Sequence, residues 1–258
     1  MSTSILRTWL FFLFSLYCAL AAAQAQKAPS AYMPQVGQEG KDVVWVPTPD
    51  DLVEKMLDMA EVTSRDFVMD LGSGDGRTVI AAAKRGARAL GIEYNPKMVE
   101  LARKNARKAG ATNAEFRKAD LFKTDFSQAT VITMFLLPEI NKKLRPRILA
   151  LKPGTRVVSN TFDMGEWQAD QVSQEIPGCD GSWCTALLWI VPAKVAGTWK
   201  TPRGEVTLKQ QFQMLSGTLR TGGKTLALTG RVRGDEVSFT AGGRQYRGRM
   251  NGSQLELR

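Results

Sequence analysis

The segment Val68–Arg77, which reads VMDLGSGDGR, constrains the fold more than any other part of the chain. Its apolar start has the composition of a buried strand, and a pattern of helical period begins directly after it. Glycines at positions 72, 74 and 76 lie between the two, and glycine lets a backbone pass close under a ligand. A strand that ends in such a loop and continues as a helix is typical of the ligand-binding edge of a parallel sheet.

The pattern on either side of this segment predicts the same α/β architecture. Short β-rich runs alternate with runs of helical period, which indicates a parallel sheet flanked by helices. The predicted helices cover residues 50–60, 78–85, 96–109 and 139–151, the last interrupted near Pro146. The predicted strands cover residues 67–71, 88–93, 115–119, 130–136 and 155–160, and a hairpin of residues 172–176 and 183–191 closes the sheet.

The chain of 258 residues contains no histidine and only three cysteines. A Ser-His-Asp triad, a Cys-His pair and a histidine-ligated zinc or iron site are therefore excluded. Three scattered cysteines cannot build a four-thiolate metal site either, so we expect no metal. Any chemistry must use carboxylates, hydroxyls, amides, aromatic groups or a cofactor.

The glycine loop also limits which cofactor it can bind. A dinucleotide fingerprint needs Gly or Ala where this chain has Arg77, and a P-loop needs a Gly-Lys-Ser/Thr ending that is absent. Asp70 precedes the glycines, Glu93 ends the next predicted strand, and Asp120 follows the third. A carboxylate at each strand end suits a ligand that carries an amine and a ribose diol.

Three segments together resemble class I S-adenosylmethionine-dependent methyltransferases over residues 41–192. They are Asp70–Gly76 (DLGSGDG), Gly91–Pro96 (GIEYNP) and Lys118–Phe122 (KADLF). A narrower resemblance, to the protein-lysine methyltransferases of the ATP-synthase c subunit and the adenine nucleotide translocase, rests on further motifs. These are Trp45–Pro49, Phe135–Pro138, Leu144–Pro146, Leu151–Gly154 and Asn160–Gly165.

The resemblance implies a Rossmann-like sheet of seven strands in the order 3-2-1-4-5-7-6, with strand 7 antiparallel. It implies S-adenosylmethionine as the cofactor. The implied cofactor-binding residues are Asp70, Gly72, Ser73, Gly74, Gly76, Glu93, Asp120 and Leu121. The candidate substrate-side residues are Trp45, Thr48, Phe135, Pro138, Asn160, Phe162 and Trp167. The aromatic residues among them, Trp45, Phe135, Phe162 and Trp167, either line a channel for an amine or belong to the hydrophobic core.

Methyl transfer from a sulfonium is an in-line displacement, so the protein mainly positions the reactants and excludes water. A lysine nucleophile must still lose its proton, to water or to a carboxylate. Asp163 and Glu139 are the candidate catalytic carboxylates near the ligand edge, or else ordinary surface side chains. The motif after the predicted strand at 130–136 is neither the Asn/Asp-Pro-Pro-aromatic motif of adenine or glutamine methylation nor a Pro-Cys nucleophile. Its apolar side chains suit a lysine stem, or they are simply the buried end of the strand.

The two ends of the chain differ from this central domain at 41–194. Residues 1–25 have the pattern of a secretory signal peptide, or of an uncleaved anchor, and residues 26–40 that of a linker. The expected location is therefore secreted or periplasmic, with membrane anchoring as the alternative. Cys179 and Cys184 form either a disulfide or two inert thiols.

Residues 195–258 predict a separate antiparallel β domain of five to seven strands, as a meander or small barrel. From Val195 onward there are eleven Lys/Arg and four Asp/Glu, so most of the +10 net charge lies here. The surplus suits contact with an anionic surface or simply solubility, but its spread does not favour nucleic acid.

The leading hypothesis is a protein-lysine N-methyltransferase whose partner is a protein substrate, which could be membrane-associated. The alternatives are a small-molecule or lipid methyltransferase, and a non-catalytic envelope-binding protein with a vestigial methyltransferase core.

Overall fold

The computed structural model describes residues 32–258. The predicted signal peptide or anchor at residues 1–25 lies outside this range. No helix among residues 32–258 has the length and hydropathy needed to cross a membrane.

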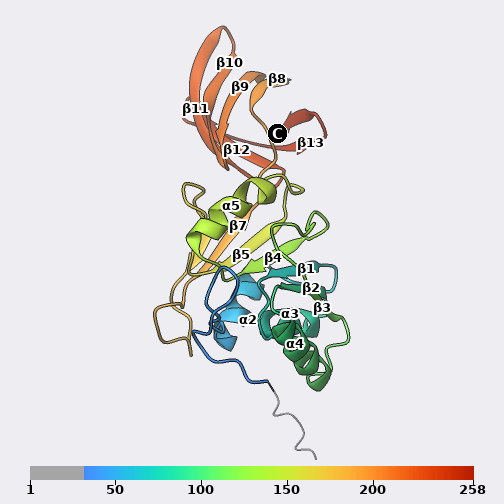
Figure 1. Ribbon diagram of the computed structural model, residues 1–258. Helices are drawn as coiled ribbons and strands as arrows, with labels where there is room; N and C mark the ends of the chain where they lie inside the picture. Colours follow the sequence, from blue (N-terminus) through green and yellow to red (C-terminus); the bar gives the residue numbers. More distant parts are fainter. Residues whose placement is uncertain (1–31) are drawn as a thin grey trace, which may run out of the picture. The chain divides into compact units, whose positions relative to one another are not determined.

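Within the described residues, one mixed sheet has the strand order β3-β2-β1-β4-β5-β7-β6 (Figure 1). Strands β1 to β5 are parallel, whereas β7 is antiparallel to both β5 and β6. The predicted fold class, strand order and reversed strand are thereby confirmed. The elements are α2 Asp50–Met59, β1 Phe67–Leu71, α3 Arg77–Lys84, β2 Arg88–Glu93, α4 Pro96–Lys108, β3 Ala114–Lys118, β4 Val131–Met134, α5 Pro138–Ile148, β5 Arg156–Asn160, β6 Gln171–Ser173 and β7 Ala186–Ile190.

Two hydrophobic cores cover the two faces of this sheet. Successive residues of a strand point to opposite faces, so Val68 of β1 belongs to one core and Met69 to the other. Helices α2, α3 and α4 pack on the first face, and α5 packs on the second. Both faces are covered, which explains why the central strands are almost entirely apolar.

Helix α5 corrects one prediction from the sequence, because it continues through Pro146. Proline removes one backbone hydrogen bond, but here it lies in the last turn of the helix. The side chains of Ile140, Leu144 and Ile148 are buried along one face and keep that turn packed. Arg147 also donates to the carbonyl oxygens of Phe122 and Thr124. These contacts stabilise the last turn of α5 by more than the missing backbone hydrogen bond destabilises it.

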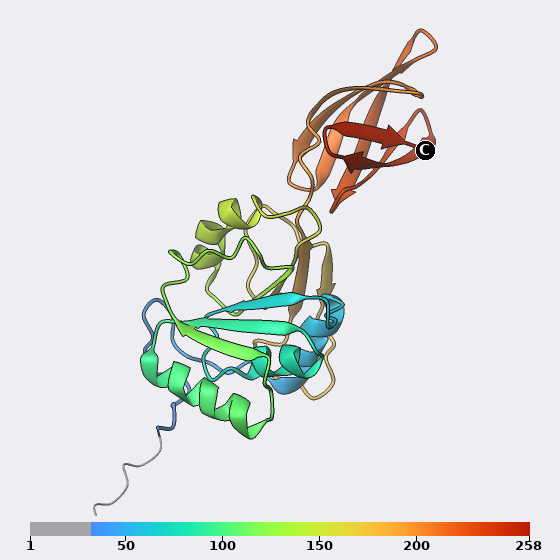
Figure 2. The ribbon, with the colours of Figure 1, turned by 90° about the vertical axis from the view of Figure 1, so that its right-hand side faces the viewer.

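A second sheet follows as an antiparallel meander in which each strand pairs with its neighbours in the chain (Figure 2). Its strands are β8 Gly197–Thr201, β9 Gly204–Gln211, β10 Met214–Thr221, β11 Lys224–Arg233, β12 Glu236–Ala241, β13 Arg244–Asn251 and β14 Gln254–Leu257. The first and last strands also contact each other. The sheet therefore curls into a barrel-like form around its own apolar core, which includes Val206, Leu219 and Phe239.

Side chains of the second sheet contact the segment between β5 and β7. The ring of Phe212 stacks on Trp167 with centroids 6.2 Å apart. Gln213 donates to the carbonyl oxygen of Gln168 at 2.7 Å, and Arg231 pairs with Asp170 at 2.6 Å. The turn between β9 and β10 thus contributes to the second core of the first sheet.

Asp66 connects three chain segments at the amino-terminal edge of the first sheet. Its carboxylate accepts hydrogen bonds from the backbone N–H and the hydroxyl of Thr63, from the Thr130 hydroxyl, and from the Arg156 guanidinium. Burial alone raises the pKa of Asp66, but these hydrogen bonds together outweigh it and hold that pKa below its ordinary value of 3.8. The ionised carboxylate therefore stabilises the fold.

We expect Asp66→Ala to lower the free energy of unfolding by about 2–4 kcal/mol, because it leaves the half-buried Arg156 without its carboxylate. The lowered pKa fixes the pH dependence. The contribution of Asp66 is complete above pH 3.8 and disappears as the pH falls through its lower folded-state value. Urea unfolding at neutral and acidic pH measures both. A variant as stable as wild type at pH 7 would contradict the assignment.

Candidate functional site

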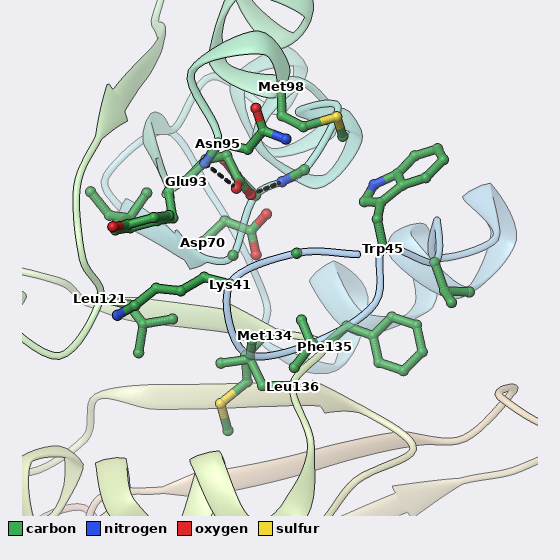
Figure 3. Close-up of a pocket in the computed structure, with 18 of the residues that line it drawn as sticks. Lys41, Trp45, Asp70, Glu93, Asn95, Met98, Leu121, Met134, Phe135 and Leu136 are labelled. Carbon is green, nitrogen blue, oxygen red and sulfur yellow. Dashed lines mark hydrogen bonds between the residues drawn. The ribbon is translucent and has the colours of Figure 1, made fainter. Parts of the chain in front are cut away.

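A cavity of about 1080 Å³, counted with its open mouth, lies at the carboxyl edge of β1, β2 and β4 (Figure 3). The glycine loop after β1 and the residues that follow β2, β3 and β4 line it. A further wall comes from residues 38–48, which precede α2 in the chain. The cavity therefore forms where the sequence places its carboxylates and glycines.

The three predicted glycines all have positive φ, of +87° at Gly72, +52° at Gly74 and +86° at Gly76. A Cβ at Gly74 would lie 2.7 Å from the indole nitrogen of Trp45. A Cβ at Gly76 would lie 2.7 Å from the ring of Phe116. Only glycine combines this conformation with such close packing, so the loop is shaped by both requirements.

Glu93 fixes the glycine loop against the end of β2. One carboxylate oxygen accepts a hydrogen bond from the Gly74 N–H at 3.0 Å, and the other accepts from the Asn95 N–H at 2.8 Å (Figure 3). Each oxygen keeps a free lone pair for a further donor. Glu93 can thus hold the loop and accept hydrogen bonds from a diol at once.

Asp70 is a buried carboxylate at the base of the cavity. It accepts a hydrogen bond of 2.6 Å from the Thr133 hydroxyl, and no cationic side chain is paired with it among the described residues. Burial raises the pKa of Asp70 to about 7, and the charges of Glu93 and Asp75 act in the same direction. A buried anion without a cation is costly, so this site favours a positively charged ligand.

The segment that precedes α2 contributes a cation and an indole to the cavity. Lys41 pairs with Asp120 at 2.8 Å and lies 4.9 Å from the centre of the Tyr94 ring. Trp45 and Phe135 lie on one side of the cavity, and Lys41 and Leu121 on the other (Figure 3). The side with Trp45 and Phe135 is therefore aromatic, whereas the side with Leu121 also carries the Lys41–Asp120 ion pair.

These residues fit S-adenosylmethionine. Asp70 would face its cationic part, Glu93 would accept from the ribose hydroxyls, and Leu121 would contact the adenine. The hydroxyl of Ser73 is buried beside Gly91 and has no hydrogen-bond partner among the described residues. Asp120 already accepts from Phe122 N–H and from Lys41, which leaves it less capacity for the adenine than the resemblance implies.

The two candidate catalytic carboxylates do not line the cavity. The exposed side chain of Glu139 pairs with Lys142 at 2.7 Å. Asp163 is also exposed and accepts from the Gly165 N–H at 3.0 Å. Both have the contacts of ordinary surface carboxylates.

Most of the predicted substrate-side residues come together. Trp45, Thr48 and Phe135 line the cavity, and Phe162 stacks on Phe135 with ring centroids 5.8 Å apart. Asn160 is buried and donates to the Thr48 hydroxyl at 3.4 Å. Pro138 is half-buried at the first position of α5, outside the cavity lining.

Of the two alternatives for Trp167, a substrate-side residue or a core residue, the structure supports the second. Its side chain is fully buried in the second core, where it packs against Trp189 and Phe212. Burial of the large ring area favours this position, although the indole N–H of Trp167 has no hydrogen-bond partner among the described residues. Trp167 is a core residue.

One aromatic residue near the site was not predicted. Trp183 lies 6.3 Å from Phe135, ring centre to ring centre, and Cys179 and Cys184 on either side of it form a disulfide. The sequence feature that could have indicated the place of Trp183 is its position just before the antiparallel strand β7. The first residues of that strand lie at the same edge as the ends of the parallel strands.

Comparisons with known proteins agree with this geometry. The family model of the ANTKMT methyltransferase domain matches residues 70–171. The chain is 45% identical over 134 residues to a protein-lysine N-methyltransferase of Saccharolobus islandicus, covering 50% of this chain and 83% of that one. It is 38% identical over 144 residues to the Mus musculus lysine N-methyltransferase of the ATP-synthase c subunit, covering 54% of this chain and 56% of that one. The chain thus spans little more than half of the mouse relative.

A solved structure is similar as well. The crystal structure of an RNA methyltransferase from Salinibacter ruber in complex with S-adenosyl-L-homocysteine shares 48% sequence identity, with a TM-score of 0.54. It covers 58% of this chain and 96% of its own. The cofactor of this chain is S-adenosylmethionine.

We expect Asp70→Asn to stabilise the ligand-free protein increasingly as the pH rises. The wild-type carboxyl binds a proton more tightly when folded, so its ionisation costs stability between pH 3.8 and about 7. The advantage of Asp70→Asn should grow by roughly 2–3 kcal/mol between pH 5 and pH 8. Urea unfolding at the two pH values measures it, with the exposed Asp163→Asn as the matched control. A pH-independent difference would contradict a raised pKa at Asp70.

We expect Glu93→Gln to weaken binding of S-adenosylhomocysteine about 10- to 100-fold, because an amide cannot accept from both backbone N–H groups and a diol. Calorimetric titration measures the affinity. Glu100→Gln, an exposed change on α4, is the control and should bind like wild type. Equal affinities of the two variants would exclude this role for Glu93.

Proposed function

This chain belongs to the family of S-adenosylmethionine-dependent methyltransferases that includes the protein-lysine N-methyltransferase of Saccharolobus islandicus, and we propose that it methylates a lysine side chain of a protein. The observation that carries the proposal is 45% identity to that relative over 83% of its length. The cavity adds chemical support. Its mouth beside Phe135 is apolar and aromatic, which suits the methylene stem of lysine.

The cofactor supplies an electrophilic methyl group, and the chain supplies position and a dry environment. Asp70, Glu93 and the glycine loop would hold the cofactor's polar groups. Met134 and Leu136 follow on the apolar wall, where they exclude water from the reacting atoms. The attacking amine must be neutral. Because neither Asp163 nor Glu139 lines the cavity, we propose that its proton leaves to water at the open mouth.

RNA is the second substrate class, because the Salinibacter protein is described as an RNA methyltransferase. Two features of this chain favour protein over RNA. The segment after β4 reads Phe-Leu-Leu-Pro at 135–138 and offers apolar groups rather than hydrogen-bonding groups for a base edge. The surplus of basic residues lies after Val195 rather than around the cavity.

The proposal predicts transfer of labelled methyl from S-adenosylmethionine to protein. The full chain is incubated with cell extract divided into protein, RNA and small-molecule fractions, and labelled protein is hydrolysed to identify the amino acid. We expect labelled Nε-methyllysine. Gly74→Arg is the inactive control, since a side chain there would meet Trp45 and fill the cavity. Label confined to RNA or to small molecules would contradict lysine methylation.

We expect Glu139→Gln and Asp163→Asn each to retain methyl-transfer activity within about threefold of wild type, because neither carboxylate lines the cavity. Initial rates at saturating cofactor measure the effect. A loss of 100-fold or more would restore that carboxylate as a general base.

We also propose that residues 1–25 direct the chain to secretion or to the periplasm, or else anchor it in a membrane, and that the basic domain at 195–258 contacts an anionic surface. The apolar run after Arg7 and the charge of the second sheet support this. Amino-terminal sequencing of the protein from fractionated cells tests it. A soluble cytosolic protein that begins at Met1 would contradict both export and anchoring.

A further inference from the structure

We propose that Trp183 is a substrate-binding residue which forms, with Phe135 and Phe162, an aromatic site for the target amine, and that the Cys179–Cys184 disulfide holds it there. The proposal rests on the proposed amine substrate and adds the residues that recognise it. Phe135, Phe162 and Trp183 together form what we call the aromatic triad.

The triad comes from three segments that the sheet topology brings to one edge. Phe135 follows β4 and Phe162 follows β5, both at the carboxyl end of a parallel strand. Trp183 precedes β7, which is antiparallel to β5 and pairs Ala186 with Asn160. The start of β7 therefore lies beside the end of β5.

The geometry of the triad suits a chain with a cationic end. Phe162 stacks on Phe135 at 5.8 Å, and Trp183 meets Phe135 edge-on at 6.3 Å with an interplanar angle of 61°. Phe135 also lines the cofactor cavity, whereas Trp183 is 44% exposed. An amine that approaches the cavity past Trp183 can contact aromatic faces before it reaches the apolar wall.

The backbone on both sides of the triad is fixed. Thr161 has φ +56°, a strained value for a β-branched residue, and its N–H donates to the carbonyl oxygen of Thr185 at 2.7 Å. Asn141 of α5 donates to the carbonyl oxygens of Phe162 and Asp163. Strain that is held by surrounding contacts is common at ligand sites.

The disulfide closes a short loop around Trp183. Cys179 and Cys184 are five positions apart, and Cys179 is buried in the first core. The loop is thereby tied to the core at one end and to β7 at the other. An exposed indole would otherwise have many positions available, so the closed loop lowers the entropy lost when it binds a substrate.

The first test measures amine contact without turnover. The full chain is labelled with 5-fluorotryptophan, and the Trp183 fluorine resonance is assigned from Trp183→Phe. The labelled protein is then titrated with Nα-acetyl-lysine methylamide and, separately, with the norleucine analogue, which lacks the ammonium group. We expect the Trp183 resonance to shift with the lysine probe and less with the norleucine probe. No shift with either probe would overturn the proposal, whether or not the chain methylates lysine.

The second test separates substrate binding from cofactor binding, using the protein or peptide labelled in the methyl-transfer assay. Trp183→Ala should raise KM for that substrate roughly 3- to 30-fold and leave kcat and the affinity for S-adenosylhomocysteine nearly unchanged. Trp183→Phe should restore much of the loss. Val172→Ala, an exposed apolar residue on β6, is the matched control. An unchanged KM in Trp183→Ala would overturn the assignment.

The third test addresses the disulfide. The double variant Cys179→Ser/Cys184→Ser should raise KM in the same direction as Trp183→Ala, and adding Trp183→Ala to it should have little further effect. Additive effects of the two changes would overturn the link between the disulfide and the indole. Circular dichroism of each variant shows that the fold is kept.

Discussion

The direction of the strands is the constraint on which the site depends. Because β1, β2, β4 and β5 are parallel, their carboxyl ends all lie at one edge of the sheet. The reversed strand β7 brings its amino end to the same edge. Residues for the cofactor and for the substrate that are more than a hundred positions apart in sequence thus lie close together at this edge.

Within this arrangement, Asp70 is the residue that lowers the stability of the ligand-free protein. A carboxylate with one neutral hydrogen bond in a buried position destabilises the ligand-free protein once it ionises. The same property makes the cavity selective for a cation. Asp66 has the opposite character at the other edge of the sheet, where three hydrogen-bond donors and the Arg156 guanidinium stabilise its charge. One edge therefore supports stability, and the other supports binding.

The sequence could predict the parts of the structure that follow from local pattern and strand order. The strand limits at 67–71 and 88–93 and the positions of Asp70 and Glu93 depend on apolar runs and glycines that are visible in one dimension. What each tryptophan contacts is not visible in that way. Trp167 and Trp183 lie in similar surroundings in sequence, yet one is fully buried against Phe212 and the other is 44% exposed beside Phe135. Only the packing of distant segments distinguishes them, as it also determines the pairing of Lys41 with Asp120.

The contact between Phe212 and Trp167 has a consequence for how the two sheets could have been joined in evolution. A side chain from the β9–β10 turn completes an apolar surface of the methyltransferase sheet, so the second sheet is more than an appended module. A protein that lost residues 195–258 would lose the Phe212 ring that stacks on Trp167, and the remaining apolar cover of that indole would come from Trp189 and the rest of the second core.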